Sequence, residues 1–258
     1  MRTLGKAMAL FLLVTAYLAA SSGISILPVN RRIKRARLVK NTSFFARLML
    51  AALGTHVTVI HRERLPGSGK GRLIVSNHLS YIDILVIASL MPSVFITSVE
   101  LKNTAFLGMM ARLGGSLFVE RRSPAGLKRE ISLISRTLVE GFSVVLFPEA
   151  ATSNGDTVRQ FKNSLFSAAI ESNAEVLPLC LRYTKMDGKP VGPENRDSIY
   201  YYGGMSFTAH ILRLLTRKSV EAELVLLKAI NLRGRAVRKE LATLAHEAIH
   251  TAYHSRRA

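Results

Sequence analysis

The sequence has no tryptophan and a single cysteine, Cys180. One cysteine cannot form a disulfide within the chain, and the absence of a Cys-x-x-Cys pair excludes a zinc ribbon or a c-type haem attachment site. Aromatic residues make up only 7% of the chain, and they are not interleaved with basic residues as in a single-stranded nucleic-acid groove. These shortages argue against a disulfide-stabilised module and against a nucleic-acid partner.

Acidic residues are also scarce, above all near the N-terminus. The chain has 36 Lys and Arg against 17 Asp and Glu, which gives a net charge of +19 and a pI near 10.7. Residues 1–70 contain twelve basic residues and one acid, Glu63, so about +11 of the charge lies there. An excess of this sign indicates a polyanionic partner, such as anionic lipid or a phosphorylated carrier.

An uncharged stretch precedes a dense basic run in this part of the chain. Residues 7–30 contain no charged side chain, and the stretch is long enough to cross a bilayer core, which takes roughly 20 apolar residues. The basic run that follows consists of Arg31, Arg32, Lys34, Arg35, Arg37 and Lys40. Basic residues beside an apolar helix are attracted to anionic head groups, so we expect the protein to bind membrane lipids.

Three arrangements of the apolar stretch are compatible with its flanks. A cleaved signal peptide is disfavoured, because the basic run after it would resist translocation. A full span would place the more basic flank, residues 31–40, in the cytoplasm by the positive-inside rule. A helix that dips into one leaflet would leave both flanks on the same side. Span and dip both predict attachment to the cytoplasmic (inner) membrane, with the active site on the cytoplasmic side.

Beyond the basic run, helical and strand-like segments alternate. A second apolar helix is predicted over residues 42–53, ended by Gly54. Strands are predicted at residues 55–61, 72–76, 95–97, 116–119, 143–147, 176–181 and 220–227, and helices at 80–90, 125–140, 161–171 and 236–254. This alternation predicts an α/β fold. We divide the chain into a membrane-associated two-helix element, residues 1–54, and an α/β domain, residues 55–258.

The segment from Asn77 to Asp83 gives the strongest chemical signal. His78 comes at the end of a buried strand, and Asp83 follows five residues later in the first turn of a predicted helix. This spacing lets the carboxylate fold back onto the imidazole, fix its tautomer and stabilise the imidazolium. The other ring nitrogen can then remove a proton from a substrate hydroxyl, as in a serine-protease triad whose nucleophile comes from the substrate. The spacing alone leaves open a histidine that merely neighbours a capping Asp.

Two further segments follow predicted strands and contain charged residues. They are residues 115–121 (Gly-Ser-Leu-Phe-Val-Glu-Arg) and residues 147–153 (Phe-Pro-Glu-Ala-Ala-Thr-Ser). Together with residues 77–83 and the strand around Pro178, these two segments make four. The four segments resemble the four sequence blocks of the glycerophospholipid acyltransferases of the bacterial lysophosphatidate acyltransferase type. The resemblance covers residues 57–181. It implies a mixed sheet flanked by helices, with an N-terminal two-helix element embedded in the membrane.

The same resemblance implies an activity and a set of site residues. The family transfers an acyl group from acyl-CoA or acyl-carrier protein to the free hydroxyl of a lysolipid, with no cofactor. His78 corresponds to the general base and Asp83 to its orienting partner. The positions implied to bind substrate are Asn77, Ser80, Arg121, Glu149 and Ser153. We therefore expect a membrane-bound O-acyltransferase of phospholipid biosynthesis or remodelling, with a lysophospholipid like 1-acylglycerol-3-phosphate as acceptor.

Two departures from the family pattern bear on the acceptor. Residues 150–152 are Ala-Ala-Thr where the family has Gly-Thr-Arg, and Ser98 replaces a family lysine. The missing side chains would bind a phosphomonoester, which takes bidentate Arg or a nearby Lys. Lys162 is a neighbouring cation that could compensate and bind substrate. Two alternatives follow: the same chemistry on lyso-ornithine lipid, and a non-catalytic membrane lipid-binding protein that has kept the fold.

One motif points to a different chemistry. Residues 246–250, His-Glu-Ala-Ile-His, match the zinc-protease pattern, in which two histidines one helical turn apart bind the metal. Four residues follow His254, too few to build a substrate cleft. We therefore expect a polar stripe on a terminal helix rather than a metal site.

Overall fold

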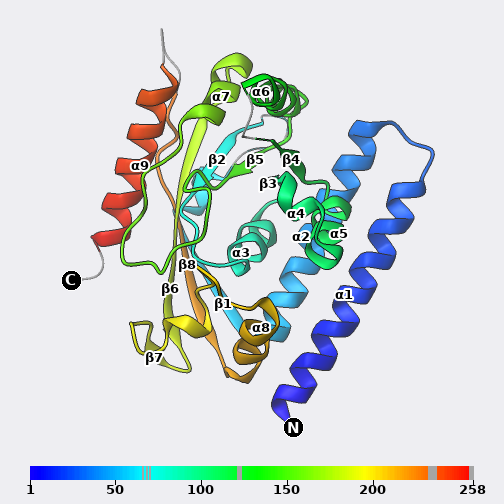
Figure 1. Ribbon diagram of the computed structural model, residues 1–258, viewed down its shortest axis with the longest axis vertical. Helices are drawn as coiled ribbons and strands as arrows, with labels where there is room; N and C mark the ends of the chain where they lie inside the picture. Colours follow the sequence, from blue (N-terminus) through cyan, green and yellow to red (C-terminus); the bar gives the residue numbers. More distant parts are fainter. Residues whose placement is uncertain (66, 68, 70, 121–123, 232–236, 256–258) are drawn as a thin grey trace.

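The computed structural model of the chain describes residues 1–65, 67, 69, 71–120, 124–231 and 237–255. An eight-stranded mixed sheet forms the centre of this part of the chain, and helices cover both of its faces (Figure 1). The strands are β1 (Thr55–Ile60), β2 (Leu73–Ser76), β3 (Val94–Ser98), β4 (Leu117–Val119), β5 (Val144–Leu146), β6 (Val176–Met186), β7 (Lys189–Pro190) and β8 (Val220–Leu226). Their order is β1-β8-β6-β2-β5-β3-β4, and β7 pairs with β6 outside this path.

The helices lie in layers on the two faces of the sheet. They are α1 (Arg2–Ile26), α2 (Arg31–Leu53), α3 (Ile82–Leu90), α4 (Val99–Lys102), α5 (Ala105–Leu113), α6 (Pro124–Val139), α7 (Ser167–Ser172), α8 (Phe207–Thr216) and α9 (Arg238–His254), with short 3-10 turns at Arg62–Arg64, Ser164–Phe166 and Arg196–Ser198. On one face α9 packs against β6, whereas on the other α3 packs against α2, and α2 against α1 (Figure 1). The predicted α/β class with a mixed, helix-flanked sheet is confirmed.

The strand directions bring the chemical motifs to one edge of the sheet. Strands β6, β2, β5, β3 and β4 run parallel, whereas β8 is antiparallel to β6 and β1 follows β8. Every residue of β2 and β5 is buried, as expected of central parallel strands. Val75 of β2 lies opposite Leu146 of β5, so the loops that follow these strands leave the sheet side by side. In open α/β sheets this carboxyl edge is where ligands bind.

Strand β6 is longer than the sequence predicted. Its end was expected at residue 181, but it continues to Met186, which pairs with Val220 of β8. Strand β2 ends at Ser76, opposite Leu179. The last part of β6 therefore extends past β2 and lies beside the loop that contains His78, because no strand separates them there.

The basic run belongs to a helix, which the sequence analysis did not predict. Helix α2 begins at Arg31 rather than at residue 42. Asn30 caps it, since its side chain accepts a hydrogen bond of 2.8 Å from the backbone N–H of Ile33. Arg and Lys are good helix formers, so the basic part continues into the apolar part without a break. No element had been predicted for the segments that form α4, α5 and α8.

Gly54 marks the predicted boundary between the two-helix element and the α/β domain. It ends α2 with a φ of 73°, a left-handed conformation that favours glycine. A Cβ at this position would lie 2.6 Å from the carbonyl oxygen of Lys218, so the close approach to the β8 side also requires glycine. The chain enters β1 at the next residue. The division into two domains at this point stays a prediction.

Helix α1 is long and apolar enough to cross a membrane, and it is the one such helix among the described residues. It packs along α2 and also contacts α5 and α8. The Lys6 ammonium donates hydrogen bonds to the carbonyls of Leu53, Arg217 and Lys218 at 2.6, 2.9 and 3.1 Å. Further along, the Tyr17 hydroxyl donates to a backbone carbonyl of α5 at 3.0 Å. Helix α1 is therefore attached to the rest of the chain at its start and at its middle.

Large apolar side chains remain exposed around this helix. They are Leu4, Met8, Phe11, Leu12 and Ile26 of α1, Ile33, Phe44 and Leu48 of α2, and Phe106 and Met109 of α5. Soluble monomers rarely expose large contiguous apolar patches, whereas a helix that lies in a membrane interface must present such side chains to lipid. The exposure and the apolar length of α1 indicate association with a membrane.

Candidate active site

His78 and Asp83 meet as their spacing predicted. The Nδ1 atom of His78 lies 2.8 Å from Oδ2 of Asp83, at the point where β2 passes into α3. The Asp83 carboxylate has no exposed surface, and the His78 side chain is 16% exposed. Because an ionised carboxylate only accepts hydrogen bonds, Nδ1 carries the hydrogen. In the neutral imidazole, the Nε2 atom of His78 then has no hydrogen and can accept a proton.

Asp83 is held by four hydrogen bonds. Besides His78, the backbone N–H groups of Leu79 and Ser80 donate to Oδ2 at 2.7 and 3.0 Å. The hydroxyl of Tyr183 donates to the other oxygen, Oδ1, at 2.7 Å. The contact from Ser80 to an acid three residues later resembles a capping box at the start of α3. Both oxygens are therefore fixed, and the carboxylate cannot rotate without breaking one of these bonds.

Glu149 connects the loop after β2 with the loop after β5. Its Oε1 accepts the backbone N–H of His78 at 2.7 Å, and its Oε2 accepts that of Arg159 at 3.0 Å. Burial raises the pKa of this carboxyl, while its backbone hydrogen bonds act in the opposite direction. The N–H of Ser153 donates to the carbonyl of His78 at 3.0 Å. The third block thus binds both backbone polar groups of His78.

The ring of Phe147 supports the imidazole from one side. The two ring centroids are 3.9 Å apart and the planes differ by 13°, which is a stacked arrangement. Phe147 is the first residue after β5 and is itself buried. With Nδ1 bound to Asp83 and one face covered by Phe147, the orientation of the imidazole is fixed before a substrate arrives.

Like Glu149, three more of the predicted substrate-binding residues make structural contacts instead of leaving their side chains free. The side-chain amide of Asn77 donates to and accepts from the backbone of Leu181, each at 2.9 Å, and thus extends the pairing of β2 with β6. The buried hydroxyls of Ser80 and Ser153 accept backbone N–H groups of Ile82 and Gly155 at 3.4 and 3.3 Å. Their contact with substrate stays a prediction.

Lys162 and Arg121 were predicted as cations of the site. Lys162 is exposed, and its backbone N–H donates to the carbonyl of Pro148 at 3.0 Å, which places it beside the third block. Arg121 lies outside the described residues. Arg159 is a second exposed cation near Glu149. Its backbone N–H donates a hydrogen bond to the Glu149 carboxylate. Lys162 and Arg159 can therefore supply positive charge at the carboxyl edge of the sheet.

The positions that depart from the family pattern have local roles. Ser98 ends β3, and its hydroxyl accepts the backbone N–H of Leu101, so it caps α4. Ala150 closes a turn in which its N–H donates to the carbonyl of Phe147 at 3.1 Å. Its φ of 65° is in the left-handed region, where a residue with a Cβ is strained. The family glycine that Ala150 replaces would adopt this conformation without strain.

The histidines near the C-terminus lie along α9, as expected of a polar stripe. The Nε2 atom of His246 lies 3.2 Å from the carbonyl of Val158, so this nitrogen donates a hydrogen bond instead of holding a lone pair toward a metal. The rings of His250 and His254 are 4.4 Å apart between centroids. Within the described ranges, no group of three or more His, Cys, Asp or Glu side chains is arranged to hold a metal ion.

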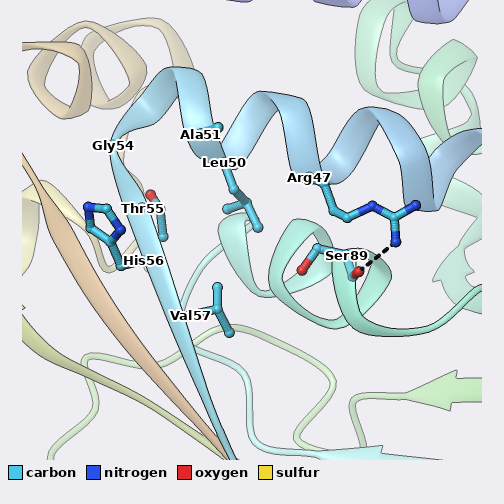
Figure 2. A pocket seen from close by; sticks show the side chains of 8 residues that line it. All are labelled: Arg47, Leu50, Ala51, Gly54, Thr55, His56, Val57 and Ser89. Atoms are coloured by element: carbon cyan, nitrogen blue, oxygen red, sulfur yellow. Dashed lines mark hydrogen bonds between the residues drawn. The ribbon is translucent and has the colours of Figure 1, made fainter.

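A surface pocket of about 340 Å³ lies between α2, β1 and the end of α3 (Figure 2). Its lining residues are Arg47, Leu50, Ala51, Gly54, Thr55, His56, Val57 and Ser89. Figure 2 shows Arg47 directed toward Ser89, to whose carbonyl it donates at 3.3 Å. Neither His78 nor Asp83 lines this pocket, so the pocket is separate from the His78–Asp83 pair.

Sequence reasoning missed Tyr183 and Phe147 as parts of the site. Phe147 was quoted within the third block, but nothing in the block indicates that its ring stacks on an imidazole. Tyr183 lies 100 residues from Asp83, in a strand predicted to end before it. The available signal was a tyrosine placed just after an apolar strand, where a buried hydroxyl requires a partner.

Comparisons with known proteins point to acyltransferases. Residues 56–182 match the model of the protein family described as Acyltransferase. A lyso-ornithine lipid O-acyltransferase of Rhizobium meliloti is 33% identical over 69% of this chain and 63% of that protein. One of Brucella abortus is 28% identical over 90% of this chain and 89% of that protein. A 1-acyl-sn-glycerol-3-phosphate acyltransferase of Neisseria gonorrhoeae is 37% identical over 48% of this chain and 49% of that protein.

A solved structure has the same fold. The crystal structure of the 1-acyl-sn-glycerophosphate acyltransferase PlsC from Thermotoga maritima matches 100% of this chain and 97% of that chain, with a TM-score of 0.70. The sequence identity is 20%, so this likeness shows the fold and not the substrate. The chain spans a little under two thirds of the Rhizobium relative and about half of the Neisseria relative.

Replacing Ala150 by glycine is expected to stabilise the protein by about 1 kcal/mol. Glycine removes the left-handed strain, which exceeds the loss from a more flexible unfolded chain. Denaturant unfolding in detergent, followed by circular dichroism, measures the change. Ala151→Gly is the matched control, because Ala151 is not among the residues with positive φ and the same change there should lower stability by about 0.5 kcal/mol. Equal effects of the two substitutions would contradict the assignment of strain to Ala150.

Proposed function

Because the chain belongs to the Acyltransferase family over residues 56–182, we propose that it is a membrane-bound O-acyltransferase whose acceptor is lyso-ornithine lipid. The family predicted from the sequence is confirmed. The sequence analysis expected a lysophospholipid as acceptor and gave lyso-ornithine lipid as an alternative. The comparisons favour lyso-ornithine lipid. The observation that supports catalysis is the buried His78–Asp83 pair, with Nδ1 on the carboxylate and Nε2 available as a base.

The reaction follows from the tautomer of His78. Nε2 accepts the proton of the acceptor hydroxyl while the hydroxyl oxygen attacks the thioester carbonyl of the acyl donor. Asp83 stabilises the imidazolium that forms. When the tetrahedral intermediate collapses, the carbon–sulfur bond breaks, and the imidazolium returns its proton to the leaving thiolate. The products are the acylated lipid and the free thiol of coenzyme A or carrier protein, and the thioester needs no further activation.

The replacement of two cations of the family pattern supports an ornithine head group. Thr152 and Ser98 stand where the family has an arginine and a lysine, and Ser98 is engaged in capping α4. A phosphomonoester carries up to two charges and is best bound by a bidentate Arg. Ornithine is an amino acid without phosphate, and its carboxylate carries a single charge. One exposed ammonium such as that of Lys162 matches this smaller demand.

The contacts of α1 support a helix that dips into one leaflet rather than one that spans. Lys6 is bound to carbonyls at the ends of α2 and α8, and Tyr17 is bound to α5. A spanning α1 would have to carry these contacts across the bilayer, whereas a helix lying in the interface keeps them and exposes Leu4, Phe11 and Leu12 to lipid. The basic start of α2 supports the cytoplasmic leaflet as the position of this interface.

His78→Ala is expected to lower kcat for acyl transfer to lyso-ornithine lipid by about 10²- to 10⁴-fold, the contribution of a general base. The assay uses a labelled acyl thioester and a panel of lysolipids with detergent-purified protein. His56→Ala is the control, because His56 is exposed on β1 and separate from the catalytic pair. Undiminished transfer by His78→Ala would exclude His78 as the base. Absence of transfer by the wild type to every lysolipid would favour the non-catalytic alternative.

Thr152→Arg is expected to raise kcat/KM for 1-acylglycerol-3-phosphate by about tenfold relative to lyso-ornithine lipid, because one charge-assisted hydrogen bond to phosphate is restored. The ratio of the two kcat/KM values, measured in mixed-acceptor competition, reports the change. Thr157→Arg adds the same charge at an exposed position of the same loop and should leave the ratio unchanged. An equal shift in both variants would attribute the effect to general charge and not to the position of the family arginine.

Cysteine labelling tests the position of α1. Burial raises the pKa of the Cys180 thiol to about 12, so the native cysteine should remain unlabelled by a maleimide. We expect Thr3→Cys, at the exposed start of α1, and Thr251→Cys, on exposed α9, to react from the same side of sealed inverted vesicles. Reaction of the two cysteines from opposite sides would establish a span and contradict the dip.

A further inference from the structure

Four groups donate hydrogen bonds to the catalytic carboxylate of Asp83. Of these, the Tyr183 hydroxyl lies farthest from Asp83 in the sequence. This hydroxyl is 2.7 Å from Oδ1 of Asp83, and the Tyr183 side chain is buried. Along β6 the side chains alternate between the two faces, so Arg182 points the other way and pairs with Glu223. Tyr183 is the first residue beyond the segment that matches the family model. It is therefore a part of the site that the matched segment does not include.

The direction of this hydrogen bond is fixed. Burial and the nearby Asp83 carboxylate raise the pKa of the Tyr183 phenol well above its usual value, so the hydroxyl stays protonated and donates. The groups that face it are Asp83 from α3, Tyr200, whose ring centroid is 5.9 Å away, and Tyr81 at the start of α3. The named neighbours contribute no cation that could replace the hydroxyl as a donor to Oδ1.

We propose that Tyr183 is a positioning residue for the catalytic pair, which acts by holding the Asp83 carboxylate so that Oδ2 faces Nδ1 of His78. The inference rests on the proposed function of this site. The Asp83 carboxylate accepts a hydrogen bond of 2.7 Å from the Tyr183 hydroxyl and one of 2.8 Å from Nδ1 of His78. Tyr183 never touches substrate in this arrangement.

The hydrogen bond has two consequences for His78. It fixes the rotation of the carboxylate, which keeps the imidazole in the orientation that directs Nε2 outward. It also withdraws negative charge from the carboxylate, which limits how strongly Asp83 stabilises the imidazolium. Without the hydroxyl, Oδ1 is left unpaired in a buried site, and the full charge acts on His78. The base then holds its proton to higher pH and is less well oriented.

The first experiment compares Tyr183→Phe with the wild type. We expect kcat to fall about tenfold with KM changed less than about twofold, as for one lost hydrogen bond to a charged group. We expect the acid limb of the kcat/KM profile to move up by about 0.5 to 1 pH unit. The matched control is Tyr202→Phe, which removes a hydroxyl from a 2.8 Å bond to Asp197 in the 3-10 turn Arg196–Ser198. It should leave both readouts unchanged.

A double-mutant cycle separates positioning from packing. If Tyr183 acts through Asp83, the effect of Tyr183→Phe on kcat should disappear in an Asp83→Asn background. An effect of full size in that background would overturn the proposal. An acid limb that coincides with that of the wild type would also overturn it, as would a change confined to KM.

A measurement that needs no acyl transfer distinguishes failure of this inference from failure of the proposed function. Titration of the His78 ring, followed by NMR with labelled histidine, should move to higher pH in Tyr183→Phe even if no lysolipid is acylated. If Tyr183→Phe does not fold, 3-fluorotyrosine at position 183 keeps the shape and strengthens the donor. The His78 titration should then move to lower pH, and an unchanged titration would refute the proposal.

Discussion

The Asp83 carboxylate is the group on which the site depends. It has no exposed surface, and a carboxylate in such a place is tolerated only when its hydrogen-bonding capacity is satisfied. Its four donors come from the loop after β2 and from the far part of β6, and Asp83 itself lies at the start of α3. Satisfying one buried charge therefore fixes three segments of backbone and the tautomer of His78 at the same time.

Strand register explains how the second half of the site reaches His78. The loops after β2 and β5 leave neighbouring parallel strands at the same height, because Val75 lies opposite Leu146. This places Glu149 where its carboxylate can bind the N–H of His78, although 71 residues separate them. The N–H of Ser153 binds the carbonyl of the same residue. The third block thus supports His78, and the turn that it forms needs a left-handed residue at Ala150.

The parts of the site that could be predicted are those in which the chemistry is local in sequence. His78 and Asp83 are five residues apart, so their contact follows from a strand-to-helix turn, and the central strands follow from continuous apolar runs. Resemblance to a family gave Glu149 as a substrate-binding residue, whereas its bond to the backbone of His78 was not predicted, because no local pattern links the two residues. Tyr183 could not be found, because it depends on β6 extending past the end of β2. The sequence analysis did not predict that the basic run is helical. It interpreted these residues as the charged flank of an apolar helix, although Arg and Lys also form helices well.

Helix α1 makes polar contacts with the rest of the chain near its start, and it exposes apolar side chains further along. Burial lowers the pKa of Lys6, and the neighbouring Arg2 acts in the same direction, so the ammonium lies in an unfavourable place unless acceptors surround it. The carbonyls at the C-terminal ends of α2 and α8 supply them, and these helix ends carry partial negative charge. Helix α1 is anchored at this polar end and packs along α2, and its remaining apolar side chains, such as Leu4, Phe11 and Leu12, stay exposed. A helix held in this way can face lipid along its length while its first turn remains beside the domain that contains His78.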